Sequence, residues 1–347
     1  MPQIELRQVD PAGMYGHIRA FPQHLKEGID IGRSLDLGAV EGKVYRSIVV
    51  AGMGGSAIAG DLLLSYLGGE LTIPFEVWRD YDLPGHAGRG TLVICSSYSG
   101  ETAETLSAYA AALKRGCSIL VITSGGKLSR SAAEHDNPAL IIPPGLPPRA
   151  ALGYSFAPLL IALGKLGICS DHSDELERVA ATLGEIQAGY SIESADNRAR
   201  EIAGGLHGGT VVIYTGGGLL RAAGVRFKGQ ICENAKQPAF CNQVPEFNHN
   251  ELVGWQNHEI VGGAFTVVML CDGDDHPQVK RRFEIAAELL RRRRIKTIQV
   301  ESEGGSRLER MLRMVHLVDF VSFYLAVLNK VDPTPVEFIN YLKDKLD

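Results

Sequence analysis

Short apolar runs alternate with longer segments of helical periodicity along most of the chain. In the first half the runs are apolar on both faces of an extended strand, as in 47–51 and 91–95. Such runs, separated by helices, predict a parallel sheet that is covered on both sides. The predicted strands cover residues 47–51, 73–78, 91–95, 118–123 and 139–142, and helices begin near residues 56 and 102.

The same alternation returns in the second half. Strands are predicted over 210–214, 265–270 and 295–300, and helices over 218–232, 277–293 and 307–328. Between the halves, residues 153–202 carry only a helical pattern, and prolines close the first sheet. We therefore expect an α/β protein with four parts, namely an N-terminal segment (1–40), a first domain (41–152), a helical linker (153–202) and a second domain ending in a helix (203–347).

Composition agrees with two globular domains. The chain has 347 residues, of which 45% are hydrophobic and 22% charged, and this excludes a disordered or fibrous chain. A net charge of −5 argues against a general nucleic-acid or anionic-membrane surface. The run Arg291–Arg294 is typical of the solvated end of a helix, where arginines complement the dipole.

Cysteine usage and the lack of a signal-like segment indicate the compartment. The six cysteines are scattered, with no C-x-x-C pair, and no run approaches 18 apolar residues. We expect a reduced, soluble, cytoplasmic protein that binds neither nucleic acid nor membrane. His258-Glu259 begins like a zinc motif but lacks the second histidine, so we expect no metal site.

A glycine turn follows the first strand and opens a helix at Gly52–Ser56. Backbone N–H groups at such a helix start attract an anion. The spacing Gly52-x-Gly54-x-x-Ala57 also fits the dinucleotide fingerprint, with Glu76 at a later strand end. A nicotinamide dehydrogenase and a purely structural strand–helix corner are therefore both alternatives.

A second loop favours a phosphate. Residues 96–102 read Ser-Ser-Tyr-Ser-Gly-Glu-Thr and follow another strand at the same carboxyl edge. Several hydroxyls beside a helix start suit the oxygens of a terminal phosphate, whereas a bridging pyrophosphate needs mostly backbone contact. A helix-capping box could use Ser99 or Thr102, but it does not explain Ser96, Ser97 and Ser99 together. Phosphomonoester binding is favoured.

Two sets of segments carry a family resemblance. Gly52–Ser56, Ser97–Thr102 and Ile122–Gly126 resemble the sugar isomerase (SIS) domain. Pro148-Arg149, the segment from Lys228 to Lys236 and Pro245–Glu251 are similar to the bifunctional phosphoglucose/phosphomannose isomerase family. The resemblance implies two flavodoxin-like SIS domains, each with a mainly parallel sheet flanked by helices. It also implies aldose–ketose isomerisation of a sugar 6-phosphate through a cis-enediol(ate), without metal or redox cofactor.

The resemblance also implies roles for single residues. Glu233 matches the carboxylate that moves the proton between C1 and C2, and Arg149 matches the arginine that steadies the enediolate charge. His249 matches the histidine that opens the sugar ring, and Lys343 matches the lysine that assists it. The phosphate cradle matches Gly54, Gly55, Ser56, Ser97, Ser99 and Thr102. From pattern alone, Glu233 is a solvated charge at a helix end, and Lys343 complements a helix dipole.

Three further expectations concern His249, Thr334 and the assembly. Asn248, Asn250 and Glu251 can orient the imidazole of His249. A small hydroxyl near the base, for which Thr334 is the candidate, would let the site accept either configuration at C2. In the family the ring-opening histidine comes from the neighbouring subunit, which implies a homodimer with shared sites. A non-catalytic sugar-phosphate sensor is the alternative, and it would need neither Glu233 nor His249.

Overall fold

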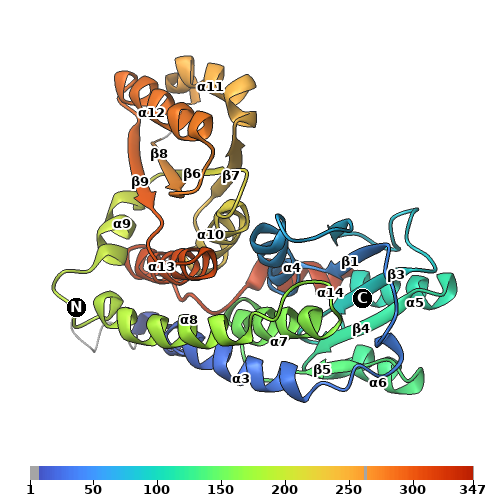
Figure 1. Ribbon diagram of the computed structural model, residues 1–347. Helices are drawn as coiled ribbons and strands as arrows, with labels where there is room; N and C mark the ends of the chain where they lie inside the picture. The colour runs from blue at the N-terminus through green and yellow to red at the C-terminus, as the bar shows by residue number, and fades with distance from the viewer. Residues whose placement is uncertain (1–7, 262–263, 347) are drawn as a thin grey trace. The chain divides into compact units, whose positions relative to one another are not determined.

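The computed structural model describes residues 8–261 and 264–346. The chain divides into two compact units, an N-terminal unit (Ala20–Glu185) and a C-terminal unit (Ile186–Asp347 together with Met1–Arg19). Each unit holds one sheet whose paired strands are all parallel, with helices packed against it (Figure 1). The predicted α/β class with two parallel sheets is confirmed. The finer boundaries, with a separate linker over 153–202, stay a prediction.

The N-terminal unit contains a five-stranded sheet in the order β2-β1-β3-β4-β5. Its strands are those that the apolar runs predict: β1 (Ser47–Gly52), β2 (Phe75–Trp78), β3 (Thr91–Ser96), β4 (Ser118–Thr123) and β5 (Ala139–Ile141). Its helices are α3 (Phe21–Ser34), η1 (Gly38–Val40), α4 (Gly54–Leu67), α5 (Ala103–Arg115), α6 (Gly126–Glu134), η2 (Pro148–Ala150), α7 (Leu152–Lys165) and α8 (Ser173–Ile186). The range expected to be a helical linker thus begins with α7 and α8.

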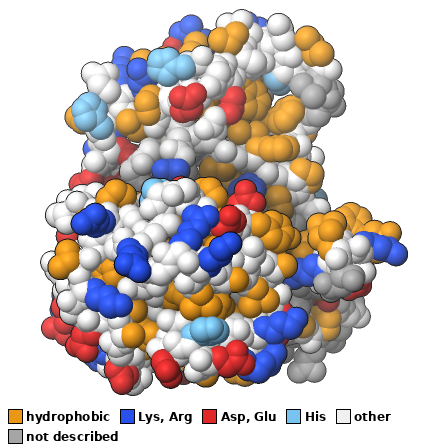
Figure 2. Space-filling view, turned by 90° about the vertical axis from the view of Figure 1, so that its right-hand side faces the viewer, with side chains coloured by type: hydrophobic (Ala, Val, Ile, Leu, Met, Phe, Trp, Pro, Cys, Tyr) orange, Lys and Arg blue, Asp and Glu red, His pale blue; other side chains and the backbone are white. Residues whose placement is uncertain are grey.

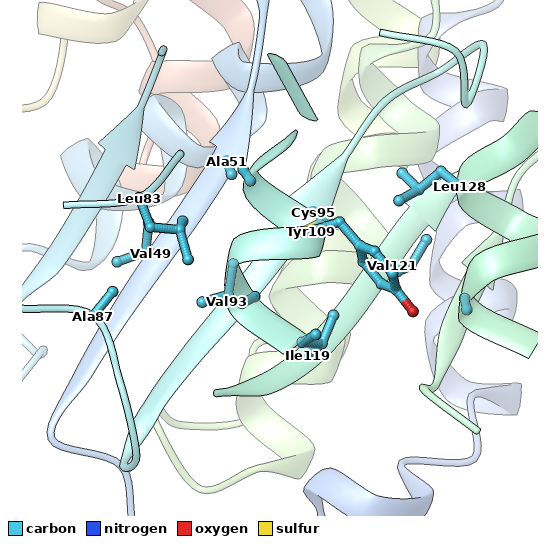
Figure 3. Close-up of a cluster of buried hydrophobic side chains, with 13 residues drawn as sticks. Val49, Ala51, Leu83, Ala87, Val93, Cys95, Tyr109, Ile119, Val121 and Leu128 are labelled. Atoms are coloured by element: carbon cyan, nitrogen blue, oxygen red, sulfur yellow. The ribbon is translucent and has the colours of Figure 1, made fainter. Parts of the chain in front are cut away.

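Side chains of β1, β3 and β4 alternate between the two faces of this sheet, and both faces are buried. One face packs against α5, α6 and the loop between β2 and β3 (Figure 3). The buried cluster on this face includes Val49, Val93, Val121, Ala108 and Leu128. On the other face α4 lies close to β1, because a Cβ on Gly60 would be 3.0 Å from Cγ1 of Val50. Burial on both faces explains why these strands read as continuous apolar runs.

The C-terminal unit contains a four-stranded sheet in the order β7-β6-β8-β9. Its strands are β6 (Thr210–Gly216), β7 (Ala239–Val244), β8 (Phe265–Cys271) and β9 (Lys296–Glu301). Its helices are α2 (Met14–Arg19), η3 (Gln187–Tyr190), α9 (Arg198–Leu206), α10 (Arg221–Asn234), η4 (Glu246–His249), α11 (Glu251–Gly254), η5 (Trp255–Val261), α12 (Pro277–Arg292), α13 (Arg307–Leu328) and α14 (Glu337–Leu346). The pattern of apolar residues did not predict β7, which is an edge strand.

Helices cover both faces of the second sheet. On one face Tyr214 stacks on Phe247 with ring centroids 4.0 Å apart, within a cluster that continues to Phe283 of α12. On the other face α10 packs closely, because a Cβ on Gly224 would overlap the methyl group of Thr215. The 22-residue α13 is long and apolar enough to span a membrane, but 89% of its most apolar window is buried inside the protein. A core helix gives the same signal.

The surface shows no broad region of one charge on the face drawn in Figure 2. Lys and Arg side chains there lie among acidic, polar and hydrophobic ones. The arginine run lies at the exposed end of α12, as predicted, and Arg292 pairs with Glu288 within that helix. These basic residues are therefore a solvated helix end.

Candidate active site

The two loops that the sequence singled out lie side by side at the carboxyl edge of the N-terminal sheet. Gly52, at the end of β1, pairs with Ser96, at the end of β3. A Cβ on Gly52 would lie 2.7 Å from the carbonyl oxygen of Ser96, so this close approach requires glycine. Gly54 begins α4 with a φ of +47°, which also favours glycine. The predicted anion-binding turn and the hydroxyl loop are thus brought together.

Hydrogen bonds join the two loops directly. The backbone N–H of Tyr98 donates to Ser56 Oγ over 3.0 Å, and the hydroxyl of Ser96 donates to the carbonyl of Ser56 over 2.8 Å. Ser56 is half-buried, Ser99 is exposed, and the Ser99 hydroxyl accepts the N–H of Glu101. Hydrogen bonds thus join the turn carrying Ser56 to the loop carrying Ser99, and both hydroxyls are at least partly accessible to solvent.

Ser97 and Thr102 act within the loop. The Ser97 side chain is fully buried, it accepts the N–H of Gly100, and its oxygen lies 2.8 Å from Thr102 Oγ1. Thr102 is the N-cap residue of α5, yet its side chain caps no helix N–H. The helix-capping alternative therefore does not account for Thr102, whose hydroxyl is bonded to Ser97 instead.

The segment 122–126 supports the same loop from the next strand. Ser124 donates from its N–H and its hydroxyl to the carbonyl of Tyr98, over 3.0 Å and 2.7 Å. The backbones of Gly100 and Gly125 are so close that a Cβ on Gly100, at a φ of +70°, would overlap the Gly125 carbonyl. These two glycines therefore allow the hydroxyl loop to rest on the neighbouring turn.

Arg149 lies against the glycine turn. It belongs to η2 and is 5% exposed. A Cβ on Gly55 would lie 2.9 Å from the backbone nitrogen of Arg149, so the backbone of this segment packs directly on the predicted phosphate cradle. A small pocket of about 10 Å³ remains between them, lined by Gly55, Ser56, Ser96, Tyr98, Ile122, Ile142, Pro148, Ala151 and Ser155.

Tyr98 is a residue of this site to which sequence reasoning gave no role. Its hydroxyl donates to the carbonyl of Pro143 over 2.9 Å and accepts the N–H of Leu146 over 2.8 Å. Burial raises the pKa of the Tyr98 hydroxyl, so it stays a neutral donor. Tyr98 thus fastens the proline-rich segment that leads to Arg149 onto the hydroxyl loop. The only sequence signal was its position inside the Ser-Tyr-Ser-Gly motif.

Glu233 is the last residue but one of α10, in the C-terminal unit. It is half-buried and borders a largely apolar pocket of about 630 Å³, together with Lys236, Asp332, Pro335 and Phe338 among others. A pocket of this volume is within the range of small-molecule sites. Its wall holds the carboxylates of Glu233, Asp332 and Glu337 and the ammonium of Lys236 between apolar side chains, and a carboxylate at such a wall can serve in proton transfer.

Lys236 joins the end of α10 to the loop that carries Thr334. Its ammonium donates to the backbone carbonyl of Glu233 and, over 3.3 Å, to that of Pro333. The N–H of Thr334 donates to Asp332 over 2.8 Å. The structure therefore brings the Thr334 loop beside Glu233. Sequence reasoning quoted Lys236 as part of a motif but gave it no function.

His249 belongs to η4, and Lys343 belongs to α14, whose first residues line the Glu233 pocket. Both are exposed, and neither lines the Glu233 pocket in the described part of the chain. Glu233 is at the end of α10, where Cys232 contacts Ala239, the first residue of β7. His249 follows the other end of the same strand, on η4. A six-residue strand separates Glu233 from His249, a length of roughly 17–20 Å.

Two neighbours of His249 have other partners than its ring. Asn250 donates to Glu246 over 2.8 Å, and Glu251 accepts the hydroxyl of Tyr214 over 3.0 Å. The buried side-chain amide oxygen (Oδ1) of Asn248 has no hydrogen-bond partner in the described residues. The interpretation that these neighbours orient the imidazole stays a prediction, while the side chains of Asn250 and Glu251 bond to Glu246 and Tyr214.

Comparisons with known proteins agree with this arrangement. A model of the SIS domain matches residues 44–147, and one described as the bacterial phospho-glucose isomerase C-terminal SIS domain matches residues 195–346. The bifunctional phosphoglucose/phosphomannose isomerase of Caldicellulosiruptor bescii is 40% identical over 96% of this chain and 98% of its own. The chain belongs to the bifunctional phosphoglucose/phosphomannose isomerase family.

Two further comparisons support family and fold. The bifunctional phosphoglucose/phosphomannose isomerase of Aquifex aeolicus is 39% identical, over 87% of this chain and 91% of its own. Among solved structures, the C-terminal domain of glucosamine-fructose-6-phosphate aminotransferase from Francisella tularensis matches with a TM-score of 0.71. It covers 93% of this chain and 98% of its own at 17% identity, and it therefore shows the fold alone. The predicted SIS fold and family are confirmed.

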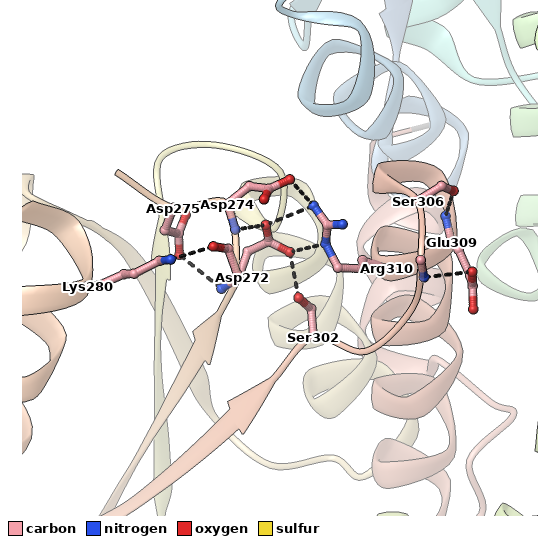
Figure 4. Close-up of polar contacts among 10 residues, drawn as sticks. Asp272, Asp274, Asp275, Lys280, Ser302, Ser306, Glu309 and Arg310 are labelled. Atoms are coloured by element: carbon pink, nitrogen blue, oxygen red, sulfur yellow. Dashed lines mark hydrogen bonds and ion pairs between the residues drawn. The ribbon is translucent and has the colours of Figure 1, made fainter. Parts of the chain in front are cut away.

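The second SIS domain does not repeat the open glycine turn of the first, where nothing lies within 4 Å of a Cβ on Gly54. The sequence showed a similar opening, a strand followed by Gly216–Gly218. In the structure a Cβ on Gly216 would clash with the carboxylate of Asp275, which also accepts the N–H of Asp272 over 3.0 Å (Figure 4). An internal carboxylate thus occupies the space beside this glycine turn.

Asp272 is the centre of the polar contacts at this edge. It is 2% exposed, and it accepts hydrogen bonds from Ser302 and from Nε of Arg310, over 2.5 Å and 3.0 Å (Figure 4). Burial alone would raise the pKa of the Asp272 carboxyl, but the bonds from Arg310 and Ser302 hold it below its ordinary value. The group is therefore an ionised structural element. The described residues contain no cluster of three or more side chains suited to hold a metal.

Proposed function

We propose that this protein interconverts glucose 6-phosphate and mannose 6-phosphate with fructose 6-phosphate. The observation that carries the proposal is the Glu233 carboxylate, half-buried at the wall of a 630 Å³ pocket, in a chain 40% identical to a phosphoglucose/phosphomannose isomerase over nearly its whole length. A sensor would need the hydroxyl loop but no carboxylate at such a pocket. The isomerase is therefore favoured over the non-catalytic alternative.

Glu233 is the proposed base. Its carboxylate takes the proton from C2 of the open-chain aldose, and the C–H electron pair becomes the C1–C2 double bond while the carbonyl oxygen O1 gains the charge. The same carboxyl group returns the proton to C1, and the proton of the C2 hydroxyl passes to O1 as the new carbonyl forms at C2. Atoms and electrons balance without an oxidant. The Arg149 guanidinium is proposed to stabilise the enediolate charge.

The phosphate is proposed to bind at the carboxyl edge of the N-terminal sheet. Gly54 and Gly55 contribute backbone N–H groups at the start of α4, where the helix dipole favours an anion. Ser56, Ser99 and Thr102 contribute hydroxyls, and the two loops are already held together by hydrogen bonds. Ser97 acts through the Gly100 N–H and the Thr102 hydroxyl, because its own side chain is buried.

The working enzyme is proposed to be a homodimer with shared sites. The separation of Glu233 from His249 by the length of β7 supports this proposal, because a single sugar cannot span roughly 17–20 Å. His249 of the neighbouring subunit would then open the ring, assisted by Lys343. We place the enzyme in the cytoplasm, where six cysteines without a disulfide are expected.

Thr334 is proposed to permit both configurations at C2. It is a small residue in a loop that Lys236 ties to the end of the Glu233 helix. A short side chain near the base leaves room for a hydroxyl on either side of C2. Replacement by glutamine should therefore lower turnover of mannose 6-phosphate more than that of glucose 6-phosphate.

A coupled assay tests the proposed function. Purified protein is supplied with fructose 6-phosphate and a chelator, and glucose 6-phosphate and mannose 6-phosphate are each measured with their own coupling enzymes. We expect both products, and the Glu233→Gln variant should form neither at a comparable rate. A protein that binds fructose 6-phosphate and forms no product would be a sensor, and a protein that forms glucose 6-phosphate alone would lack the second activity.

A further inference from the structure

A network of buried polar side chains joins α10 to α13 along the turns of α10 that lead to Glu233. Asp319 of α13 accepts two hydrogen bonds from Arg226, over 2.9 Å and 2.6 Å, and one from Gln230 over 2.9 Å. The side chains of Arg226 and Asp319 are each 4% exposed. Burying such a pair costs desolvation energy, so a simple apolar contact would hold the helices together at less cost.

The chain of contacts continues to the last turn of α10. Asn234 is fully buried, and its amide donates to Ser322 Oγ over 2.9 Å. The Ser322 hydroxyl donates in turn to the backbone carbonyl of Asp319 over 2.7 Å. Arg226, Gln230 and Asn234 are spaced four residues apart and therefore share one face of α10. This face is fixed against α13 by directional bonds along three successive turns.

Glu233 is the residue next to the end of this network. The last turn of a helix lacks intrahelical partners for its carbonyls and frays readily. Because successive side chains are about 100° apart around a helix, holding Asn234 against α13 also sets the direction in which Glu233 points. The bonds from Lys236 to the carbonyls of Glu233 and Pro333, and from Asn329 to the carbonyl of Ala235, hold the backbone. The Asn234 amide adds the side-chain bond that fixes the face of this last turn against α13.

We propose that Asn234, through Ser322, is a positioning residue that sets the orientation of the Glu233 carboxylate at its pocket. The inference rests on the proposed function, since it assumes that Glu233 transfers the proton. Loosening the last turn of α10 would leave substrate binding nearly intact, because the phosphate contacts lie on other residues. It would displace the base, and a displacement of about 1 Å can reduce turnover by roughly 10²-fold.

The test compares Asn234→Ala and Ser322→Ala with a control for stability. Asn197 is also buried, and its amide donates to Tyr324 of α13 over 3.1 Å and to Ser191 over 2.8 Å. It belongs to the start of α9 and touches no residue of α10 in these bonds. Asn197→Ala should therefore lower the unfolding temperature without changing kcat.

Steady-state kinetics with fructose 6-phosphate are measured well below the unfolding temperature of each variant. We expect Asn234→Ala to lower kcat by roughly 10–100-fold with KM within about twofold. Ser322→Ala should change the same parameter in the same direction, and the double variant should lose no more than the larger single loss, because both remove one contact. Ser322→Ala keeps the test decisive if Asn234→Ala does not fold.

Three other outcomes would contradict either the positioning role of Asn234 or the proposed function. If folded Asn234→Ala and Ser322→Ala keep the kcat of Asn197→Ala, the positioning role is wrong while the proposed function stands. If KM rises and kcat stays, the network serves substrate binding and the inference is also wrong. A wild-type protein without isomerase activity overturns the proposed function and the inference together.

Discussion

Glu233 and His249 lie at opposite ends of β7 in the same unit, with the whole strand between them. A strand of this length spans roughly 17–20 Å, which favours a site to which two subunits contribute. If the neighbouring subunit supplies the histidine, inactive Glu233→Gln and inactive His249→Ala proteins should restore activity when they exchange subunits. A mixed dimer retains one intact site, so recovery should approach half of the wild-type rate per mixed dimer.

Subunit exchange is followed in the same samples, for example by energy transfer between labelled chains. Mixing the Glu233→Gln protein with more of itself is the control and should restore nothing. Exchange without recovered activity would contradict the shared site.

A second prediction concerns the hydroxyls of the loop 96–102. In Ser97→Ala with Thr102→Val, the Gly100 N–H loses its side-chain acceptor and keeps only the backbone carbonyl of Ser97, and the Thr102 hydroxyl is absent. Each lost hydrogen bond is worth about 0.5–1.5 kcal/mol, so KM for fructose 6-phosphate should rise roughly 10-fold while kcat falls less. Thr182→Val removes an exposed hydroxyl of α8 and should leave KM unchanged. A variant that loses kcat at constant KM would place these hydroxyls outside phosphate binding.

Much of the fold could be predicted because its strands are buried on both faces. β3 is buried at every position and is apolar from Leu92 to Cys95, and such a run can be recognised without knowledge of distant residues. β7 escaped prediction because it is an edge strand with exposed Phe240 and polar Asn242 and Gln243. Its place in the sheet comes from parallel pairing with β6, which no local pattern encodes.

The candidate site could also be predicted from the sequence only in part. The hydroxyl loop could be predicted, since its residues are consecutive and follow a strand. The function of Tyr98 could not, because its partners at Pro143 and Leu146 belong to a distant loop. The Asn234–Ser322 contact likewise joins two helices that are far apart in sequence. Interactions of this kind follow from tertiary packing and leave no periodic trace.

A third prediction concerns the pH dependence of the stability that Asp272 contributes. Its pKa is lowered in the folded protein, so its contribution to stability is present above the unfolded value of about 3.9 and is lost as pH falls through the lower folded value. Asp272→Asn should unfold at a clearly lower temperature at pH 7, and the gap to wild type should shrink towards pH 3. Thermal melts across this range measure it.

The control for Asp272 is Glu303→Gln. Glu303 is a largely exposed partner of Arg313, and surface pairs contribute little. Its substitution should change the unfolding temperature only slightly at every pH. A gap for Asp272→Asn that is constant with pH would show that its charge does not matter.

A fourth prediction follows from the Asp275 carboxylate beside Gly216 and concerns the number of anions bound per chain. Since this acidic side chain fills the space next to the second glycine turn, an anion should find only the site of the first domain. Titration calorimetry of the Glu233→Gln protein with fructose 6-phosphate should give one molecule bound per chain. Two molecules per chain would show that the second turn also accepts a phosphate.

The most direct test of the central claim is exchange of substrate hydrogen with solvent at Glu233. In heavy water the wild-type protein should place deuterium at C1 or C2 of the sugar phosphate, as read by NMR. Glu233→Gln keeps the size of the side chain but removes the base, so turnover should fall by at least roughly 10²–10⁴-fold. Incorporation should fall equally while affinity for fructose 6-phosphate stays. Equal incorporation by both proteins would contradict the assignment of Glu233 as the base.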